Sequence, residues 1–443
     1  MLEPQGTLFF LLLVMVFAGL MVWLILTKQM VLRIVAALLA FLPAMVFGIA
    51  AVNKYYDYYQ NWGSLFSDLS GQSGQTIPQM SAASLGKDTG RSVSSLLAAS
   101  TNPALDAQTG YLFWTTVTGP KSHLTRQVYV YLPPQYFSKQ YASYRFPAIE
   151  LLHGSPGNPG TWVNVMNVIP MYLSELQSHH AQPAVLVMPD TDGGFQYGLQ
   201  CLNDPGGLQD MTFVGQEVPN WVAANLRVDR PGPLWGIGGY SEGGFCAANI
   251  GLQDAARFGY AGSLSGYFAP IASQVPMNGK PGGHPININV FAHHPPLLAR
   301  NTPQEYVLRI PIGVVVPQFF LAAGSLDTSD VRDAEYFRQL LLTRVASVPL
   351  MVVPGGGHQA MVWRSALRPM LDWMTTQATT QEQEDLAVAR RTAQDARQAE
   401  MRARHSLKRH SGYGRPLTAH PVLPPPSLPR PVQPVLTGPS SPF

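Results

Sequence analysis

The stretch "GIGGYSEGGFCA", Gly236–Ala247, decides the fold of this chain. Within it, Gly239 to Gly243 fit the pattern G-x-S-x-G, in which glycines let a strand turn sharply into a helix and leave the serine hydroxyl exposed. Five residues with three fixed positions also occur in ordinary Gly-rich loops. Ser241 therefore needs partners elsewhere in the sequence before it can be interpreted as a nucleophile.

The sequence around this stretch alternates short apolar runs with helical stretches. The runs end at glycine, proline or polar residues, as buried strands do. The expected strands are "YLFWTTVTG", "QVYVYLPP", "FPAIELLHG", "PAVLVMPD", "PLWGIGGYS", "YAGSLSGYF", "PQFFLAAGSLD" and "VPLMVVPGGGH". This alternation predicts an α/β fold with a mainly parallel sheet of about eight strands, covered by helices on both faces.

Three of these strands end at residues that suit nucleophilic catalysis. Ser241, Asp327 and His358 each follow an expected strand, and parallel strands bring their carboxyl ends to one edge. The order Ser, Asp, His is that of α/β-hydrolases. His358 is expected to take the proton of Ser241, and Asp327 to orient the imidazole. Asp330 is expected to cap the helix that begins "VRDAEYFRQLL".

An oxyanion formed at Ser241 needs backbone N–H donors. One is expected from Glu242, which starts the helix after the nucleophile. The other is expected from "LLHGSPGNPG", where Pro156 has no N–H and Ser155 is the better candidate. The glycines of that segment are equally compatible with a tight turn alone.

A few residues near the same edge are candidates for substrate contact. Asp190 lies beyond a strand end in "MPDTDGG", and Trp162, Trp363 and Phe195 could line an acyl pocket. Each also has a simpler interpretation, since an Asp before glycine favours a turn and aromatic residues pack in cores.

The N-terminal region carries two long apolar runs, Leu8–Leu26 and Ile34–Val52, each long enough to cross about 30 Å of hydrocarbon as a helix. They predict a two-helix transmembrane hairpin, with Pro43 kinking the second helix. A cleaved signal peptide is the alternative for the first run. Lys28 and Arg33 between the runs place the connection in the cytoplasm and the rest of the chain outside.

We expect four segments: residues 1–55 as the hairpin, 56–105 as a linker, 106–378 as the catalytic domain, and 379–443 as a tail. The linker is rich in Ser, Gly and Gln, although a small ordered cap is also possible there. The tail joins a charged helical stretch to a Pro-rich segment that we expect to be disordered. The localisation predicted is the cell membrane, multi-pass, with an extracytoplasmic catalytic domain.

The composition of the chain limits the kinds of partner that we expect it to bind. Hydrophobic residues make up 46% and charged residues 12% of the chain, which fits a membrane-associated protein. The net charge of +3 is small and does not indicate a protein that binds nucleic acid. No metal or other cofactor is expected, because the pairs His179–His180 and His293–His294 do not lie in clusters with ligand spacing.

The two cysteines, Cys201 and Cys246, both fall near the active-site edge of the expected sheet. In an oxidising compartment they would form a disulfide between a substrate loop and the helix after Ser241. The alternative is a buried Cys246 and a free thiol at Cys201.

Taken together, "VYLPPQY", "LLHGSPGNPGTW", "GYSEGGFCA", "GSLD" and "GGGHQAMVWRSALRPMLDWM" resemble the bacterial esterase family that includes esterase D, feruloyl esterases and the mycolyltransferases of the actinobacterial envelope. The resemblance covers roughly Tyr111 to Met374. It implies the same triad and oxyanion donors. Mycolyltransferases usually carry a glutamate as the acid, so Asp327 favours an esterase.

The function predicted is therefore a membrane-anchored serine esterase that acts through an acyl-Ser241 intermediate on a carboxylic ester, with an envelope lipid or glycolipid among the possible substrates. Two alternatives stay open. One is an acyltransferase that moves the acyl group to an envelope sugar or lipid alcohol. The other is a binding protein on a hydrolase fold without catalysis.

Overall fold

The structure is a computed structural model that describes residues 3–59, 61–69, 103–193, 200–205, 207–270 and 295–410. The chain divides into two compact units, Met1–Glu384 and Asp385–Phe443. The first unit holds the N-terminal helices, the sheet and every candidate site residue. The described part of the second unit is the end of one long helix, α15.

A mixed sheet of eight strands forms the centre of the first unit, in the order β1-β2-β4-β3-β5-β6-β7-β8. β1 pairs with β2, and β2 with β4, in antiparallel orientation, whereas the other neighbours are parallel. The mainly parallel sheet predicted from the apolar runs is thus confirmed. The strands are β1 (Tyr111–Thr118), β2 (Thr125–Leu132), β3 (Ala148–Leu152), β4 (Val185–Pro189), β5 (Gly232–Tyr240), β6 (Phe258–Leu264), β7 (Gln318–Gly324) and β8 (Leu350–Val353).

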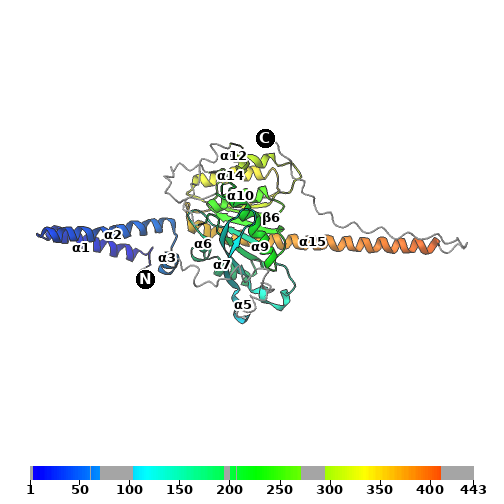
Figure 1. The fold of residues 1–443 in the computed structure, drawn as a ribbon, viewed down its shortest axis with the longest axis horizontal. Helices are drawn as coiled ribbons and strands as arrows, with labels where there is room; N and C mark the ends of the chain where they lie inside the picture. The colour runs from blue at the N-terminus through cyan, green and yellow to red at the C-terminus, as the bar shows by residue number, and fades with distance from the viewer. Residues whose placement is uncertain are drawn as a thin grey trace. The chain divides into compact units, whose positions relative to one another are not determined.

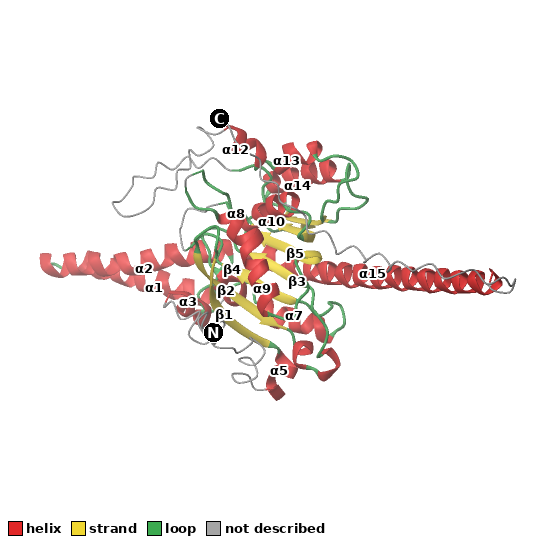
Figure 2. Cartoon of the chain, turned by 45° about the vertical axis from the view of Figure 1, so that its right-hand side comes forward, coloured by secondary structure: helices red, strands yellow, loops and turns green. Residues whose placement is uncertain are grey.

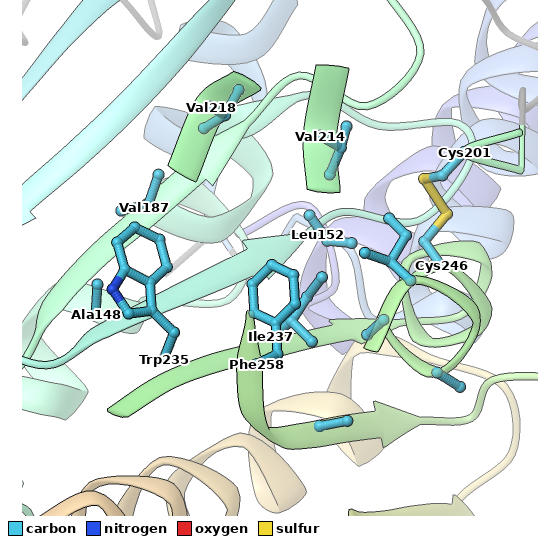
Figure 3. Packing of buried hydrophobic residues seen from close by; sticks show 14 of the residues in the cluster. Ala148, Leu152, Val187, Cys201, Val214, Val218, Trp235, Ile237, Cys246 and Phe258 are labelled. Atoms are coloured by element: carbon cyan, nitrogen blue, oxygen red, sulfur yellow. A yellow bond between two sulfur atoms is a disulfide. The ribbon is translucent and has the colours of Figure 1, made fainter. Parts of the chain in front are cut away.

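Helices cover both faces of this sheet (Figure 2). Because successive side chains of a strand point to opposite faces, β2 sends Val128 and Val130 into one buried cluster, and Tyr129 and Tyr131 into the other. Figure 3 shows part of the first cluster. The helices of the domain are α5 (Pro103–Thr109), α6 (Pro159–Asn164), α7 (Val168–Gln177), α8 (Asp210–Thr212), α9 (Val218–Asn225), α10 (Glu242–Gln253), α12 (Pro295–Arg300), α13 (Pro303–Tyr306), α14 (Thr328–Leu341) and α15 (Ala360–His410).

Two apolar helices precede the domain, α1 (Thr7–Leu26) and α2 (Met30–Tyr56), and they run side by side (Figure 1). Both are long and apolar enough to cross a membrane. Pro43 lies inside α2. Most of the large apolar side chains of both helices are exposed in the chain alone. Such a surface is costly in water and suits lipid.

The other predicted segments are described only in part. A short helix, α3 (Trp62–Leu69), and the start of α5 lie in the segment predicted to be a linker. Helix α15 runs without a break across residue 378, where the catalytic domain was expected to end. The Pro-rich tail, Phe195 and the pair His293–His294 lie outside the described residues.

Candidate active site

Ser241 occupies a strained turn between β5 and α10. Its backbone has φ 54° and ψ −123°, a conformation that a non-glycine residue rarely adopts. The Ser241 N–H donates to Leu264 O at 2.8 Å, which holds the turn against β6. A Cβ at Gly243 would lie 2.1 Å from the carbonyl oxygen of Leu152, so only glycine lets α10 approach β3 this closely.

His358 reaches Ser241 from the loop between β8 and α15. Its Nε2 lies 2.9 Å from Ser241 Oγ, within hydrogen-bond distance. The imidazole also packs edge-on against Trp363, with ring centroids 5.3 Å apart. The structure therefore brings together the predicted nucleophile and base from the carboxyl ends of two strands.

Two carboxylates meet the other ring nitrogen of His358, and the structure corrects the predicted cap of α14. Nδ1 of His358 lies 2.8 Å from Asp330 Oδ2 and 3.4 Å from Asp327 Oδ2. Asp327 is the N-cap of α14, where its side chain accepts from the Asp330 N–H at 3.2 Å and from Ser329 Oγ at 2.7 Å. Asp330 was expected to cap this helix and Asp327 to orient His358. Asp327 is the cap instead, and Asp330 makes the shorter contact with His358, while Asp327 stays within ion-pair distance of the same nitrogen.

The charges of this group perturb one another. Burial alone would lower the pKa of His358, but Asp330 and, more weakly, Asp327 outweigh burial and raise the pKa. The pKa of Asp330 is raised by burial, assisted by the neighbouring Asp327. Burial would also raise the pKa of Asp327, but hydrogen bonds from Ser329 and Asp330 lower it. An imidazole beside two carboxylates is well placed to accept and hold a proton.

The expected oxyanion donors lie next to Ser241. Glu242 is the first residue of α10, so its N–H has no acceptor within the helix. Ser155 follows Gly154, where a Cβ would lie 3.1 Å from the Cβ of Ser241. The loop after β3 thus passes close to the nucleophile. The assignment of both N–H groups as oxyanion donors remains a prediction.

The side chain of Glu242 belongs to a buried acidic group that includes Asp192 and Asp210. Its Oε1 accepts from the Gln200 N–H at 3.0 Å. Burial raises the pKa of Glu242 to about 7, and burial raises the pKa of Asp192 and of Asp210 to about 6 each. Arg126 makes an ion pair with Asp210. Protonation of Glu242, which its raised pKa favours below about pH 7, spares the oxyanion a repulsive charge.

A second cluster, which sequence reasoning missed, joins His153 to Asp190 and Asp192. Asp190 Oδ1 lies 3.6 Å and Asp192 Oδ1 3.7 Å from His153 Nε2. These three residues are close enough together to hold a metal ion. However, His153 Nδ1 lies 2.9 Å from Gly154 O, and Nε2 accepts from the Thr191 N–H at 3.1 Å. Both ring nitrogens are engaged, so the cluster buttresses the loop after β3.

Asp190 was also predicted to contact substrate. Its Oδ1 accepts from the N–H groups of Asp192 at 3.2 Å and Gly193 at 2.8 Å, which is the turn interpretation. The signal that could have found this cluster is the pair of motifs "LLHG" and "MPDTD", which lie at the carboxyl ends of β3 and β4. These strands are neighbours in the sheet.

The two tryptophans predicted to line an acyl pocket lie in the core. Trp162 has no exposed surface and Trp363 is 6% exposed. Tyr240 lies between them, 5.1 Å from the ring of Trp162 and stacked at 4.5 Å on Trp363. The predicted substrate contact is wrong for Trp162, because a buried ring cannot reach a ligand. Trp363 packs edge-on against the imidazole of His358.

Cys201 and Cys246 form a disulfide (Figure 3). Cys246 lies on α10, in the helix that begins directly after Ser241. Both cysteines are buried in the first core cluster. The disulfide and the bond from Gln200 to Glu242 tie the segment around Cys201 to the nucleophile helix.

Comparisons with known proteins identify the family of this chain. The Esterase family model matches residues 123–374. A protein of Corynebacterium glutamicum, described only as uncharacterized, is 25% identical over 281 residues, which span 61% of this chain and 62% of that protein. The MPT51/MPB51 antigen of Mycobacterium tuberculosis is 39% identical over 65 residues, which span 15% of this chain and 21% of the antigen.

Among solved structures, a ferulic acid esterase superposes with a TM-score of 0.51 at 21% identity. The superposition covers 61% of this chain and 98% of the esterase. At this identity, the likeness supports the α/β-hydrolase fold and says nothing of substrate.

Proposed function

Because the chain belongs to the esterase family, we propose that it is a membrane-anchored serine esterase that hydrolyses carboxylic esters through an acyl-Ser241 intermediate. The observation that carries the proposal is the contact series from Ser241 Oγ to His358 Nε2 at 2.9 Å, and from His358 Nδ1 to Asp330 at 2.8 Å. A nucleophile, a base and an orienting acid in that geometry are what serine hydrolysis requires.

The chemistry runs in two steps. Ser241 Oγ attacks the ester carbonyl while its proton moves to His358 Nε2, and the N–H groups of Ser155 and Glu242 stabilise the oxyanion. The bond to the alcohol breaks, and the alcohol leaves with the proton held by His358. Water then loses a proton to His358 and attacks the acyl carbonyl, the bond to Ser241 Oγ breaks, and His358 returns the proton to Ser241 as the carboxylic acid leaves. Asp330 keeps the Nδ1 proton in place throughout.

Membrane anchoring is supported by α1 and α2, whose length and hydropathy suit membrane crossing. The short connection Thr27–Gln29 contains Lys28, and Arg33 lies in the first turn of α2. These charges favour a cytoplasmic connection and an extracytoplasmic catalytic domain at the cell membrane. A signal sequence would also have the length and hydropathy of α1. Retention of intact full-length chain in membranes after alkaline carbonate extraction distinguishes anchoring from cleavage.

A fluorophosphonate probe tests the enzyme proposal directly, because it labels only an activated serine. We expect labelling at Ser241 of the full chain and none in Ser241→Ala. Folded wild-type protein that takes no label would favour the alternative of a hydrolase-fold binding protein.

Acyl transfer is the remaining alternative, because an acyl-enzyme can pass its acyl group to an alcohol as well as to water. The acyl-enzyme would be the same, with an envelope sugar or lipid alcohol replacing water. Turnover of a p-nitrophenyl ester with and without glycerol or trehalose separates the two. A new acyl-alcohol product in place of the free acid would identify a transferase.

A further inference from the structure

The exit of the second apolar helix is a fixed turn. Helix α2 ends at Tyr56, and Asp57 adopts a left-handed conformation with φ 51°. The side chain of Asn53 brackets Tyr59, accepting from its N–H at 2.8 Å and donating to its carbonyl oxygen at 2.9 Å. Gln5 from the start of the chain donates to the same oxygen at 3.1 Å. Residues Asp57–Tyr59, called here the exit segment, are thus fixed to the hairpin.

The exit segment is also bound to the catalytic domain through Arg364. This arginine makes an ion pair with the Asp57 carboxylate and donates to Asp57 O at 3.2 Å. Its other nitrogen, Nη1, donates to Val165 O at 2.9 Å. Arg364 lies on α15, the helix that follows His358, and Val165 is the C-cap of α6. One guanidinium therefore joins the hairpin to helices that flank the active site. Both partners of the ion pair are largely buried, which strengthens it relative to a surface pair.

Tyr58, which follows Asp57, contacts the loop after β3 that holds Ser155, called here the oxyanion loop. Tyr58 Oη donates to Pro156 O at 3.3 Å, and Pro156 directly follows Ser155. Tyr58 and Tyr59 also pack against the buried cluster that contains Tyr240 and Trp363. Tyr240 is the last residue of β5 before Ser241. The exit segment therefore packs against the buried cluster that contains the residue before the nucleophile, and it contacts the loop after β3.

The position of α2 in a bilayer determines how far these contacts lie from the membrane surface. Its 27 residues would span about 40 Å, which exceeds the roughly 30 Å of hydrocarbon. The last turn holds Lys54, Tyr55 and Tyr56, residues that suit the headgroup layer. Tyr58 lies two positions beyond Tyr56, a reach of at most about 7 Å. The oxyanion loop therefore lies at the level of the lipid headgroups when α2 spans the membrane.

We propose that the acyl donor is an ester resident in the membrane, which enters the active site at headgroup level because the exit segment clamps the oxyanion loop to the end of α2. This inference rests on the proposed esterase function and the proposed membrane hairpin. The substrate class is a lipid ester whose scissile bond lies at the bilayer surface. One product of its hydrolysis would stay in the bilayer.

The test uses the full chain reconstituted in phosphatidylcholine vesicles and three esters with the same acyl group and the same chromogenic alcohol. One ester is free in water. The second is tethered to a lipid anchor by a short spacer, and the third by a long polyethylene glycol spacer. At equal surface density, we expect the short-spacer ester to be hydrolysed at least as fast as the long-spacer ester. Hydrolysis of the long-spacer ester more than tenfold faster would place the site far above the bilayer and overturn the inference.

The soluble ester and fluorophosphonate labelling separate the two levels of proposal. If Ser241 is not labelled and the soluble ester is not hydrolysed, the esterase proposal fails. If both succeed while the short-spacer ester resists hydrolysis, only the membrane-substrate inference fails.

Variants test the clamp. Asp57→Asn together with Tyr58→Phe removes the ion pair and the hydrogen bond to Pro156. We expect the ratio of short-spacer to long-spacer turnover to fall about fivefold, the factor that corresponds to about 1 kcal/mol. The matched control is Tyr56→Phe, which removes a hydroxyl from an exposed side chain in the same region and should leave the ratio unchanged. An unchanged ratio in the double variant, with labelling at Ser241 intact, would overturn the role of the clamp.

Discussion

Oδ2 of Asp330 lies 2.8 Å from Nδ1 of His358, on the side of the imidazole opposite to Ser241. Asp330 is in the first turn of α14, and Asp327 caps the same helix. Both carboxylates therefore face one ring nitrogen that carries a single proton. The shorter distance and the capping bonds of Asp327 favour Asp330 as the acid that orients His358.

Substitution of the two aspartates tests this assignment. Asp330→Asn should lower kcat/KM by about 10³-fold or more, because an amide favours the wrong imidazole tautomer. Asp327→Asn should cost about tenfold or less, since asparagine still caps a helix. The measurement is the hydrolysis of p-nitrophenyl butyrate by the full chain. Asp333→Asn on the same helix is the control, and the reverse ranking would return the role to Asp327.

The pH dependence of activity follows from the raised pKa of His358. Catalysis needs the neutral imidazole, so kcat/KM should rise with pH and reach half its maximum above the ordinary histidine value of about 6.5. Asp330→Asn removes the main charge that raises this pKa, so the midpoint should move to lower pH. A pH–rate profile of both proteins checks this. An unmoved midpoint in the variant would show that Asp330 does not face His358 in solution.

The sequence allowed Ser241 and His358 to be placed together because parallel strands deliver their carboxyl ends to one edge. It could not rank Asp327 against Asp330. Both follow β7 within one helical turn, and their roles depend on the backbone of Asp327, with φ −91° and ψ 80°. That conformation aims its side chain at the Asp330 N–H.

Contacts between segments that are distant in sequence could not be predicted, for a different reason. The cluster of His153 with Asp190 and Asp192 requires that β3 and β4 are neighbours, which the strand order decides and the sequence does not state. The pair of Asp57 and Arg364 likewise depends on how the hairpin meets the domain. Trp162 was misassigned because periodicity does not distinguish a buried ring from one that lines a pocket.

The disulfide should contribute strongly to stability. Its cysteines are 45 residues apart in sequence, and closing a loop of that length corresponds to about 4 kcal/mol in the chain-entropy description. Cys201→Ser with Cys246→Ser should lower the free energy of unfolding by roughly that amount, measured with urea. Intact mass after alkylation without reductant checks the bond itself. Two alkylated thiols in protein taken from membranes would argue against both the bridge and an outward-facing domain.

At Gly243, the turn that holds Ser241 leaves no room for a side chain. A methyl group there would lie 2.1 Å from Leu152 O and 2.6 Å from His153 O, both backbone atoms that cannot move aside. Gly243→Ala should push α10 away from β3, destabilise the fold by about 3 kcal/mol or more and abolish labelling of Ser241. Gly313→Ala is an informative contrast, since its Cβ would meet nothing although its φ of 91° adds strain. Wild-type labelling in Gly243→Ala would contradict the close approach.

Ionisation of Glu242 should lower the stability of the protein in mildly alkaline solution and reduce the gain in activity that neutral His358 brings. Burial raises its pKa from 4.5 to about 7, so the folded state binds the proton more tightly than the unfolded chain. The resulting stabilisation is complete below the unfolded pKa and is lost as the pH rises through about 7, a change of about 3 kcal/mol. Glu242→Gln keeps an acceptor for the Gln200 N–H but carries no charge.

At pH 8.5 the variant Glu242→Gln should therefore be more stable than wild type, and at pH 5 the two should differ by less than about 1 kcal/mol. Urea unfolding at both pH values measures the difference, with the exposed Glu305→Gln as the control. Activity provides a second readout, because an ionised Glu242 beside the oxyanion hole repels the developing negative charge. Above pH 7 the variant should therefore have a higher kcat/KM than wild type. Equal stability of the two proteins at pH 8.5 would mean that the Glu242 carboxylate is already solvated or paired in the folded state.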